Sequence, residues 1–298
     1  MSARPPRRRV NGVLLIDKPA GLTSNACLGV VKRLLNADKA GHTGTLDPFA
    51  TGLLPVVLGE AAKFSQGLLE ADKSYLGVMR LGVTTTTGDP EGEVIATWPV
   101  TASDHEVRAA MQGFVGAIQQ VPPMHSALKR DGRPLYDYAR AGLVVEREAR
   151  SVRIELLEWL GRDGDAVSFR VACSKGTYVR TLAEDIGARL GCGAHLSALR
   201  REQVGPLDLD QALTFAQLET LDMAARDARV LPVDTLVLAL PMLALDADLT
   251  RRLRLGQRIP VAAPDTDAAR AYGEGGSFLG VVRIAAGVAH PTRLVGVA

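Results

Sequence analysis

The stretch from Gly41 to Pro55, GHTGTLDPFATGLLP, constrains the fold most, because its composition opposes regular secondary structure. Its three glycines and two prolines predict that most of it is loop. Asp47 is its only carboxylate, and the apolar run 53–58 follows closely. A single acid in a glycine-rich loop beside an apolar wall is a candidate for a working carboxylate. The alternative is that Asp47 and Pro48 only begin a turn, since Asp accepts local backbone hydrogen bonds and Pro fixes φ.

Five segments of the chain carry a resemblance to one family. They are 17–24 (DKPAGLTS), 41–52 (GHTGTLDPFATG), 72–75 (DKSY), 173–182 (CSKGTYVRTL) and 199–201 (LRR). These segments resemble the motifs of pseudouridine synthases, and most closely those of the bacterial TruB-type tRNA pseudouridine-55 synthases. They follow the family's order, and five ordered motifs are far more specific than one.

The resemblance implies an isomerisation of uridine 55 in the T loop of tRNA. The bond between N1 and C1′ breaks, the base turns, and C5 joins C1′. The family's catalytic carboxylate corresponds to Asp47, which would attack C1′ or remove the C2′ proton to give a glycal; the sequence leaves both routes open. Arg180 would pair with Asp47 through two hydrogen bonds, lowering a carboxyl pKa that apolar walls raise.

The target uridine is stacked in folded tRNA and must be flipped out, at a cost of roughly a few kcal/mol. By resemblance, Tyr75 would stack on the flipped uracil and help to take the C5 proton. Tyr178 would line the other side, His42 would contact the space that the base leaves, and Leu199 would supply an apolar wall. The alternatives are core packing for Tyr178 and Leu199, and a backbone-satisfied loop histidine for His42. Lys18 is interpreted as a support for the site and not as a catalyst.

Periodicity predicts the elements that carry the first motifs. Residues 13–16 predict a short buried strand. Thr23 or Ser24 is a suitable N-cap for a helix whose apolar face is Cys27, Val30, Val31, Leu34 and Leu35. Residues 75–83 predict a strand with Tyr75 at its start. Asp89 is interpreted as a turn residue, because Asp before Pro is common turn chemistry.

Two further helices are predicted. Ser103 and Glu106 form a capping-box pattern, and apolar spacing from Val107 to Ile118 predicts a helix that ends at the two prolines 122–123. Alternation over 167–173 predicts a half-buried strand, followed by a helix with Tyr178 and Arg180 in its first turn. A cation at a helix N-terminus opposes the macrodipole, so a partner elsewhere is expected, and Asp47 is the candidate.

A length of 298 residues suggests about two domains. We expect a basic disordered tail over 1–9, a catalytic domain over 10–240, and a small PUA-like RNA-binding β domain over 246–298. The resemblance implies an α/β fold with a large mixed, mostly antiparallel sheet.

Residues 124–153 are basic and interleaved with aromatic residues, which is typical of an RNA-gripping insertion. The alternative is a solvated surface hairpin-and-helix excursion. The family often has a tyrosine where this chain has His125.

Composition limits the partners. The net charge is only +2, so tRNA recognition should depend mainly on T-stem-loop shape. Three cysteines without zinc spacing indicate reduced thiols in the cytoplasm. Neither a signal peptide nor a run of about 18 apolar residues is present, so no membrane is expected. The reaction needs no cofactor or metal, and we expect a monomer without an obligate protein partner.

Two other functions are compatible with parts of the sequence. The chain could bind and refold tRNA, with catalysis secondary, although Asp47, Tyr75 and Arg180 are all present. Residues 243–250, LALDADLT, fit a phosphatase signature of the haloacid-dehalogenase type, with Asp246 as nucleophile and Asp248 as acid/base over magnesium. The chain that follows is too short for that domain, so this segment is interpreted as the start of the second domain.

Overall fold

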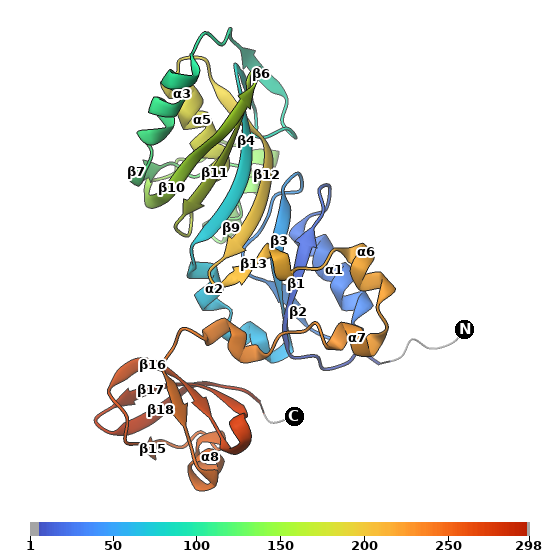
Figure 1. Cartoon of the computed structure of the whole chain (residues 1–298), viewed down its shortest axis with the longest axis vertical. Helices are drawn as coiled ribbons and strands as arrows, with labels where there is room; N and C mark the ends of the chain where they lie inside the picture. Colours follow the sequence, from blue (N-terminus) through green and yellow to red (C-terminus); the bar gives the residue numbers. More distant parts are fainter. Residues whose placement is uncertain (1–5, 297–298) are drawn as a thin grey trace.

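The computed structural model describes residues 6–296. Its largest element is a nine-stranded sheet (Figure 1). The strand order is β1-β3-β12-β4-β11-β10-β7, with β2 beside β3 and β13 beside β12. Its strands are β1 (Gly12–Lys18), β2 (Ala40–His42), β3 (Thr51–Leu58), β4 (Lys73–Leu81), β7 (Gly116–Gln120), β10 (Arg150–Asp163), β11 (Ala166–Cys173), β12 (Ala194–Val204) and β13 (Leu207–Asp208). Every neighbouring pair is antiparallel except β3 with β12. The predicted mixed, mostly antiparallel sheet is confirmed.

The parallel junction between β3 and β12 is short, with Thr51 opposite Arg200 and Gly52 opposite Arg201. It joins the β1–β3 part of the sheet to the part built on β4, β10, β11 and β12. The backbones approach closely at Gly52, where φ is +100° and a Cβ would lie 2.3 Å from the Arg201 carbonyl oxygen. Only glycine adopts this backbone conformation without a steric penalty, so the motif glycine allows the junction to form.

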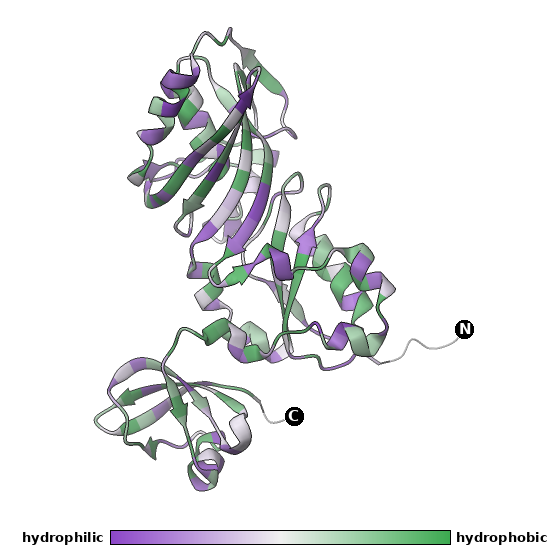
Figure 2. Ribbon diagram, in the orientation of Figure 1, coloured by the Kyte–Doolittle hydropathy of each residue, from purple (hydrophilic) through white to green (hydrophobic). Residues whose placement is uncertain are grey.

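Helices cover one face of the part built on β4, β10, β11 and β12, and helical segments cover both faces of the β1–β3 part. Val107 and Met111 of α3 and Leu182 of α5 pack on Phe169 and Met79 of the strands. The helices are α1 (Ser24–Leu34), α2 (Gln66–Glu70), α3 (Asp104–Gln112), α4 (Leu135–Arg140), α5 (Val179–Arg189), α6 (Phe215–Thr220), α7 (Met223–Asp227) and α8 (Ala247–Arg254). They carry both hydrophilic and hydrophobic residues along their length, as amphipathic helices do (Figure 2). Within residues 6–296, no helix has the length and apolarity that a membrane crossing needs.

The predicted helix start near Thr23 is confirmed. The Thr23 hydroxyl accepts a hydrogen bond from the Ala26 N–H at 3.1 Å, which caps α1. The Ser24 hydroxyl bonds to both the N–H and the carbonyl of Leu46, at 2.9 and 3.0 Å. The helix start therefore anchors the loop one residue before Asp47.

The predicted helix after Ser103 is right at its start and wrong at its end. Its capping box is present, but α3 stops at Gln112 and the chain turns at Gly113 into strand β7. Ile118 therefore lies on an edge strand and not on a helix. The apolar spacing in this segment fits both a helix and the alternation of a strand. Gly113 ends the helix as its C-cap, and Gly116 is the first residue of the strand.

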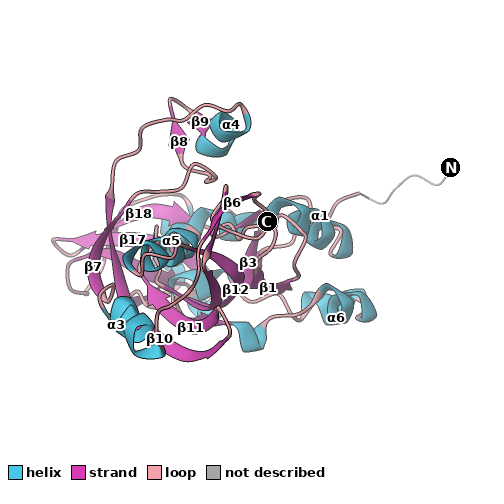
Figure 3. Cartoon of the chain, turned by 90° about the horizontal axis from the view of Figure 1, so that it is seen from above, coloured by secondary structure: helices cyan, strands magenta, loops and turns pink. Residues whose placement is uncertain are grey.

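Two separate two-stranded hairpins lie outside the two larger sheets. The hairpin strands are β5 (Val83–Thr85) with β6 (Val94–Thr97), and β8 (Lys129–Arg130) with β9 (Arg133–Pro134). Seen from above, β8, β9 and α4 project from the body of the sheet (Figure 3). This hairpin-and-helix excursion is the form that the alternative interpretation of 124–153 describes, and the RNA-gripping role of the segment stays a prediction.

The predicted disordered tail is wrong for two of its arginines. Arg7 donates to the Lys32 carbonyl at 2.7 Å, and Arg8 pairs with Asp227 at 2.5 Å. These contacts fix the segment against α1 and α7. Residues 1–5 of the predicted tail lie outside the described residues.

A second, five-stranded sheet forms the small C-terminal β domain, in the order β14-β16-β17-β18-β15. Its strands are β14 (Met242–Ala244), β15 (Ile259–Pro260), β16 (Thr266–Tyr272), β17 (Phe278–Ala285) and β18 (Val288–Leu294). The first strand begins four residues before the predicted boundary at 246. Phe278 packs edge-on against Phe64 of the 3₁₀ helix η1 (Gly59–Phe64), with ring centroids 5.3 Å apart. This contact joins the C-terminal domain to the part of the chain that holds the nine-stranded sheet.

The two aspartates of the phosphatase signature have structural partners. Asp246 caps α8 by accepting from the Leu249 N–H at 2.8 Å. Asp248 pairs with Arg251 and Arg252 of the same helix. The pattern is a helix start, which supports its interpretation as the beginning of the second domain.

We expect Gly52→Ala to lower the free energy of unfolding by about 1–3 kcal/mol, because the added Cβ collides with the β12 backbone. Gly29→Ala is the matched control. Gly29 is exposed in α1 and an added Cβ meets open space, so this change should raise the free energy of unfolding by about 0.5–1 kcal/mol. Urea denaturation measures both, and equal stability of Gly52→Ala and wild type would contradict the close approach.

Candidate active site

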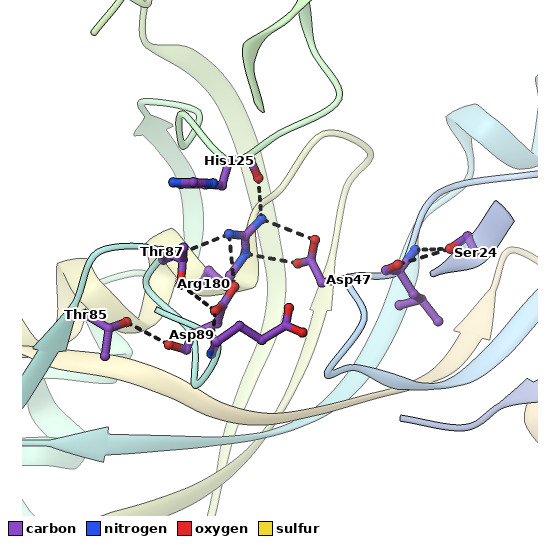
Figure 4. Close-up of polar contacts among 9 residues, drawn as sticks. Ser24, Asp47, Thr85, Thr87, Asp89, His125 and Arg180 are labelled. Carbon is purple, nitrogen blue, oxygen red and sulfur yellow. Dashed lines mark hydrogen bonds and ion pairs between the residues drawn. The ribbon is translucent and has the colours of Figure 1, made fainter. Parts of the chain in front are cut away.

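Arg180 is the centre of the site, one residue into α5 and only 4% exposed. Its Nε lies 3.0 Å from Asp47 Oδ2, and an Nη lies 3.4 Å from Asp47 Oδ1. The predicted two-point ion pair is therefore present. The same guanidinium contacts the Asp89 carboxylate at 3.2 Å and donates to the carbonyls of Thr87 and His125 at 2.9 and 2.7 Å (Figure 4). Four acceptors from three loops thus converge on one cation.

Asp47 is partly buried but open on one side, with a side chain that is 35% exposed. Burial raises the pKa of its carboxyl, the Arg180 charge lowers it, and the Asp89 charge raises it again. The exposed side leaves the carboxylate accessible to a ligand. A carboxylate of raised pKa beside a fixed cation can act as a nucleophile or as a base.

Asp89 is a turn residue as predicted, and in addition its carboxylate contacts Arg180, which the sequence interpretation did not include. It is 3% exposed, and besides the ion pair it accepts from the Thr87 hydroxyl at 2.5 Å and the Glu91 N–H at 3.0 Å. These bonds are those of a turn, and they aim the carboxylate at Arg180. Asp before Pro has the same local signal in an ordinary turn, so sequence alone did not separate the two roles.

Tyr75 lies on β4 directly opposite Arg201 of β12, and both side chains are buried, at 8% and 1% exposed. Burial raises the pKa of the Tyr75 hydroxyl, and the neighbouring Arg201 charge opposes this. Arg201 also donates to the carbonyls of Leu53 and Gly44, at 2.7 and 3.2 Å. No role for Arg201 follows from the sequence beyond its place in the motif 199–201, because its burial on β12 depends on the tertiary structure.

Lys18 is fully buried beneath the Asp47 loop. Its ammonium donates to the carbonyls of Pro19 and Pro48 at 2.9 and 3.1 Å. Burial lowers its pKa, and the charges of Cys27 and Asp47 oppose this. The contacts hold the residue after Asp47 in place, as the expected support role requires.

The three remaining predicted residues surround this centre. His42 ends β2, and within the described residues its buried Nδ1 has no hydrogen-bond partner. Burial lowers the His42 pKa, with the Arg201 charge acting in the same direction. Tyr178 is the N-cap residue of α5, and burial raises its pKa. Leu199 shares a buried apolar cluster with Tyr75.

A cavity of about 380 Å³ lies on the sheet, and its lining includes Leu199 of the predicted site and Phe49, two residues after Asp47. Its lining also includes Leu76 and Val78, which alternate with Tyr75 along β4 and so face the opposite side of the sheet. Neither Asp47 nor Arg180 lines it. The candidate active site is the open side of Asp47 and not this cavity.

Known proteins are similar in sequence to this chain over nearly its whole length. Residues 32–179 match the N-terminal domain of the TruB family pseudouridylate synthases. Residues 180–238 match the tRNA pseudouridylate synthase B C-terminal domain, and 241–295 match the C-terminal domain of pseudouridine synthase II TruB. The tRNA pseudouridine synthase B of Ralstonia nicotianae is 56% identical over 98% of this chain and 96% of its own. The tRNA pseudouridine synthase B of Burkholderia mallei is 56% identical over 99% of this chain and 98% of its own.

Solved structures share the fold. The chain in the crystal structure of a Cbf5-Nop10-Gar1 complex superposes with a TM-score of 0.68 at 28% identity, over 91% of this chain and 78% of that chain. The chain in the archaeal box H/ACA sRNP Nop10-Cbf5 complex gives a TM-score of 0.71 at 25% identity, over 96% and 86%.

The mixed sheet and the likeness to these sequences define a pseudouridine synthase, an isomerase that acts on RNA. The chain belongs to the TruB family, and its reaction is the formation of pseudouridine in tRNA. The family predicted from the five motifs is confirmed.

We expect Arg180→Met to lower the free energy of unfolding by about 3–5 kcal/mol, because it leaves Asp89 buried without its cation. The matched control is Arg153→Met. Arg153 pairs with Glu155, but its side chain is 61% exposed, so its loss should change stability by about 0.5 kcal/mol or less. Urea midpoints measure both, and equal midpoints for the two variants would mean that Arg180 does not hold the site together.

Proposed function

We propose that this enzyme isomerises uridine 55 in the T loop of tRNA, with Asp47 as its catalytic carboxylate. The observation that carries the proposal is the Asp47–Arg180 ion pair, buried on the Arg180 side and open on the Asp47 side. Arg180 fixes the carboxylate in one orientation, and the open side admits the sugar. Tyr75 is the aromatic residue available to stack on the uracil. It lies near enough to Asp47 for the carboxylate charge to raise the pKa of its hydroxyl.

The chemistry is an isomerisation in which atoms and electrons balance within the substrate. The bond between N1 and C1′ breaks and the bond between C5 and C1′ forms. C5 loses a proton and N1 gains one. Asp47 acts at C1′ as a nucleophile or at C2′ as a base, and both routes need its ionised form. Tyr75 helps to accept the C5 proton.

The target base must leave its stack before it can react, and the site offers surfaces to receive it. Tyr75 stacks on the flipped uracil, Tyr178 lines the other side, and Leu199 closes the apolar wall. His42 contacts the space that the base leaves, where its unpartnered Nδ1 is available for a hydrogen bond.

The projecting segment 124–153 grips the RNA. Arg133 lies over the Tyr138 ring at 4.7 Å and Arg140 over the Tyr136 ring at 5.4 Å, which presents paired cationic and aromatic surfaces. The C-terminal domain, with the basic last turn of α8, acts as a PUA-like RNA-binding module. We infer that the enzyme works in the cytoplasm as a monomer, without an obligate protein partner.

The test is a single-turnover assay with a T-stem-loop RNA that carries tritium at uridine C5, which is released as pseudouridine forms. We expect release by wild type, and a loss of at least about 10⁴-fold in Asp47→Asn with RNA affinity retained. An RNA whose only uridine in the loop is position 55 tests the site of reaction. Tight binding without release by wild type would favour a tRNA-binding or tRNA-folding protein instead. Equal release by both proteins would remove Asp47 from the chemistry.

The same assay gives a pH dependence. Because the folded-state pKa of Asp47 is raised, its carboxyl protonates at a higher pH than an ordinary Asp, and protonation stops both routes. The rate should therefore fall on acidification well before the ordinary Asp value of about 3.9 is reached. RNA affinity at each pH is the control, and a rate that stays constant down to pH of about 4 would contradict the raised pKa.

A further inference from the structure

We propose that Gln120 is a positioning residue of the reaction, which fixes the start of α5 and thereby aims Arg180 at Asp47. The inference rests on the proposed function of Asp47, and it adds a residue outside the five motifs. Gln120 is the last residue of β7 and is 2% exposed, although its neighbour Gln119 is exposed.

The Gln120 side chain binds one backbone unit through both of its polar ends. Its Nε2 donates to the Tyr178 carbonyl at 3.1 Å, and its Oε1 accepts from the Tyr178 N–H at 2.7 Å. A primary amide can form this reciprocal pair because it carries a donor and an acceptor side by side. The Gln120 amide thus forms with Tyr178 the two backbone hydrogen bonds that a neighbouring strand would otherwise form.

That residue is the last one before helix α5, five residues after strand β11 ends at Cys173. Tyr178 has extended dihedral angles, φ −101° and ψ 106°, and its carbonyl also accepts the first-turn bond from Leu182 at 3.0 Å. Among the described residues, no side chain caps α5 through its own hydroxyl or carboxylate in the usual way. The amide of Gln120 supplies the missing restraint, two residues before Arg180.

The same segment contacts Arg180 a second time. Five residues beyond Gln120, the His125 carbonyl accepts from the Arg180 guanidinium at 2.7 Å. Residues 120–125 therefore hold the backbone at Tyr178 and the side chain at Arg180. They also lead directly into β8, β9 and α4, the projecting elements that we propose bind RNA, so RNA binding there could affect the orientation of Arg180.

The experiment compares wild type with Gln120→Met, Gln120→Glu and the matched control Gln119→Met, all as full chains. Met has a similar length but forms neither hydrogen bond, and Glu keeps an acceptor for the Tyr178 N–H but cannot donate to its carbonyl. Tritium release at saturating T-stem-loop RNA gives the rate, filter binding gives the Kd, and the rate is followed against pH.

We expect Gln120→Met to lower the single-turnover rate by about 10- to 100-fold, the size of a small misplacement of catalytic groups, with Kd unchanged within about threefold. The acidic limb of its pH–rate profile should move to higher pH, because a loosened Arg180 opposes the raised pKa of Asp47 less well. Gln120→Glu should fall between Met and wild type, and Gln119→Met should match wild type.

A purely structural role would lower the thermal midpoint or the active fraction and leave the rate per active molecule and the pH limb unchanged; that result would overturn the inference. Failure of both Gln120 variants to fold would overturn it in the same way. A loss that appears only in Kd would also overturn it. Absence of release by wild type would instead overturn the proposed function, on which this inference depends.

Discussion

The burial of one guanidinium among four acceptors is the interaction on which the rest of the site depends. Arg180 is almost inaccessible to water, and a buried cation costs several kcal/mol of desolvation unless its partners have good geometry. Asp47, Asp89 and two backbone carbonyls supply that geometry. The cation in turn permits a carboxylate to stay ionised in a place where burial favours its neutral form. The pKa of Asp47 thus depends on a balance between burial and one fixed charge.

Two other buried cations serve the loop that carries Asp47. Lys18 binds the carbonyls on one side of the loop, and Arg201 binds the carbonyl of Gly44 on the other. A glycine- and proline-rich loop makes few backbone hydrogen bonds of its own, so these side chains replace the missing secondary structure. The loop also spans the short junction of β3 with β12, where few strand hydrogen bonds are available. Charged side chains therefore hold the two parts of the sheet in the register that brings Asp47 to Arg180.

Sequence reasoning located most elements and the central pair, for identifiable reasons. The helix after Thr23 and the strand 167–173 have strong periodicity, and the family motifs linked Asp47, Tyr75 and Arg180. An arginine at a helix N-terminus indicated a distant partner, and the structure supplies two. Where local signals are ambiguous, the predictions were wrong: Ile118 lies on a strand, and Arg7 and Arg8 are fixed by contacts.

The residues that sequence reasoning missed all act through long-range contacts. Asp89, Gln120 and Arg201 are separated from their partners by many tens of residues, and each has a common local interpretation as a turn, strand or surface residue. Their role becomes visible only when their polar side chains are found to be buried, and that burial is known only from the tertiary structure. The feature they share is a buried polar side chain with at least one partner far away in the sequence.

The most direct test of this account is the pKa of the Asp47 carboxyl, measured in the free protein by carbon NMR titration. The resonance is assigned by its absence in Asp47→Asn. We predict a single titration with a pKa above the ordinary Asp value of about 3.9, because burial outweighs the Arg180 charge. A pKa at or below that value would contradict the account, since the ion pair would then dominate and the carboxylate would be stabilised instead of poised for reaction.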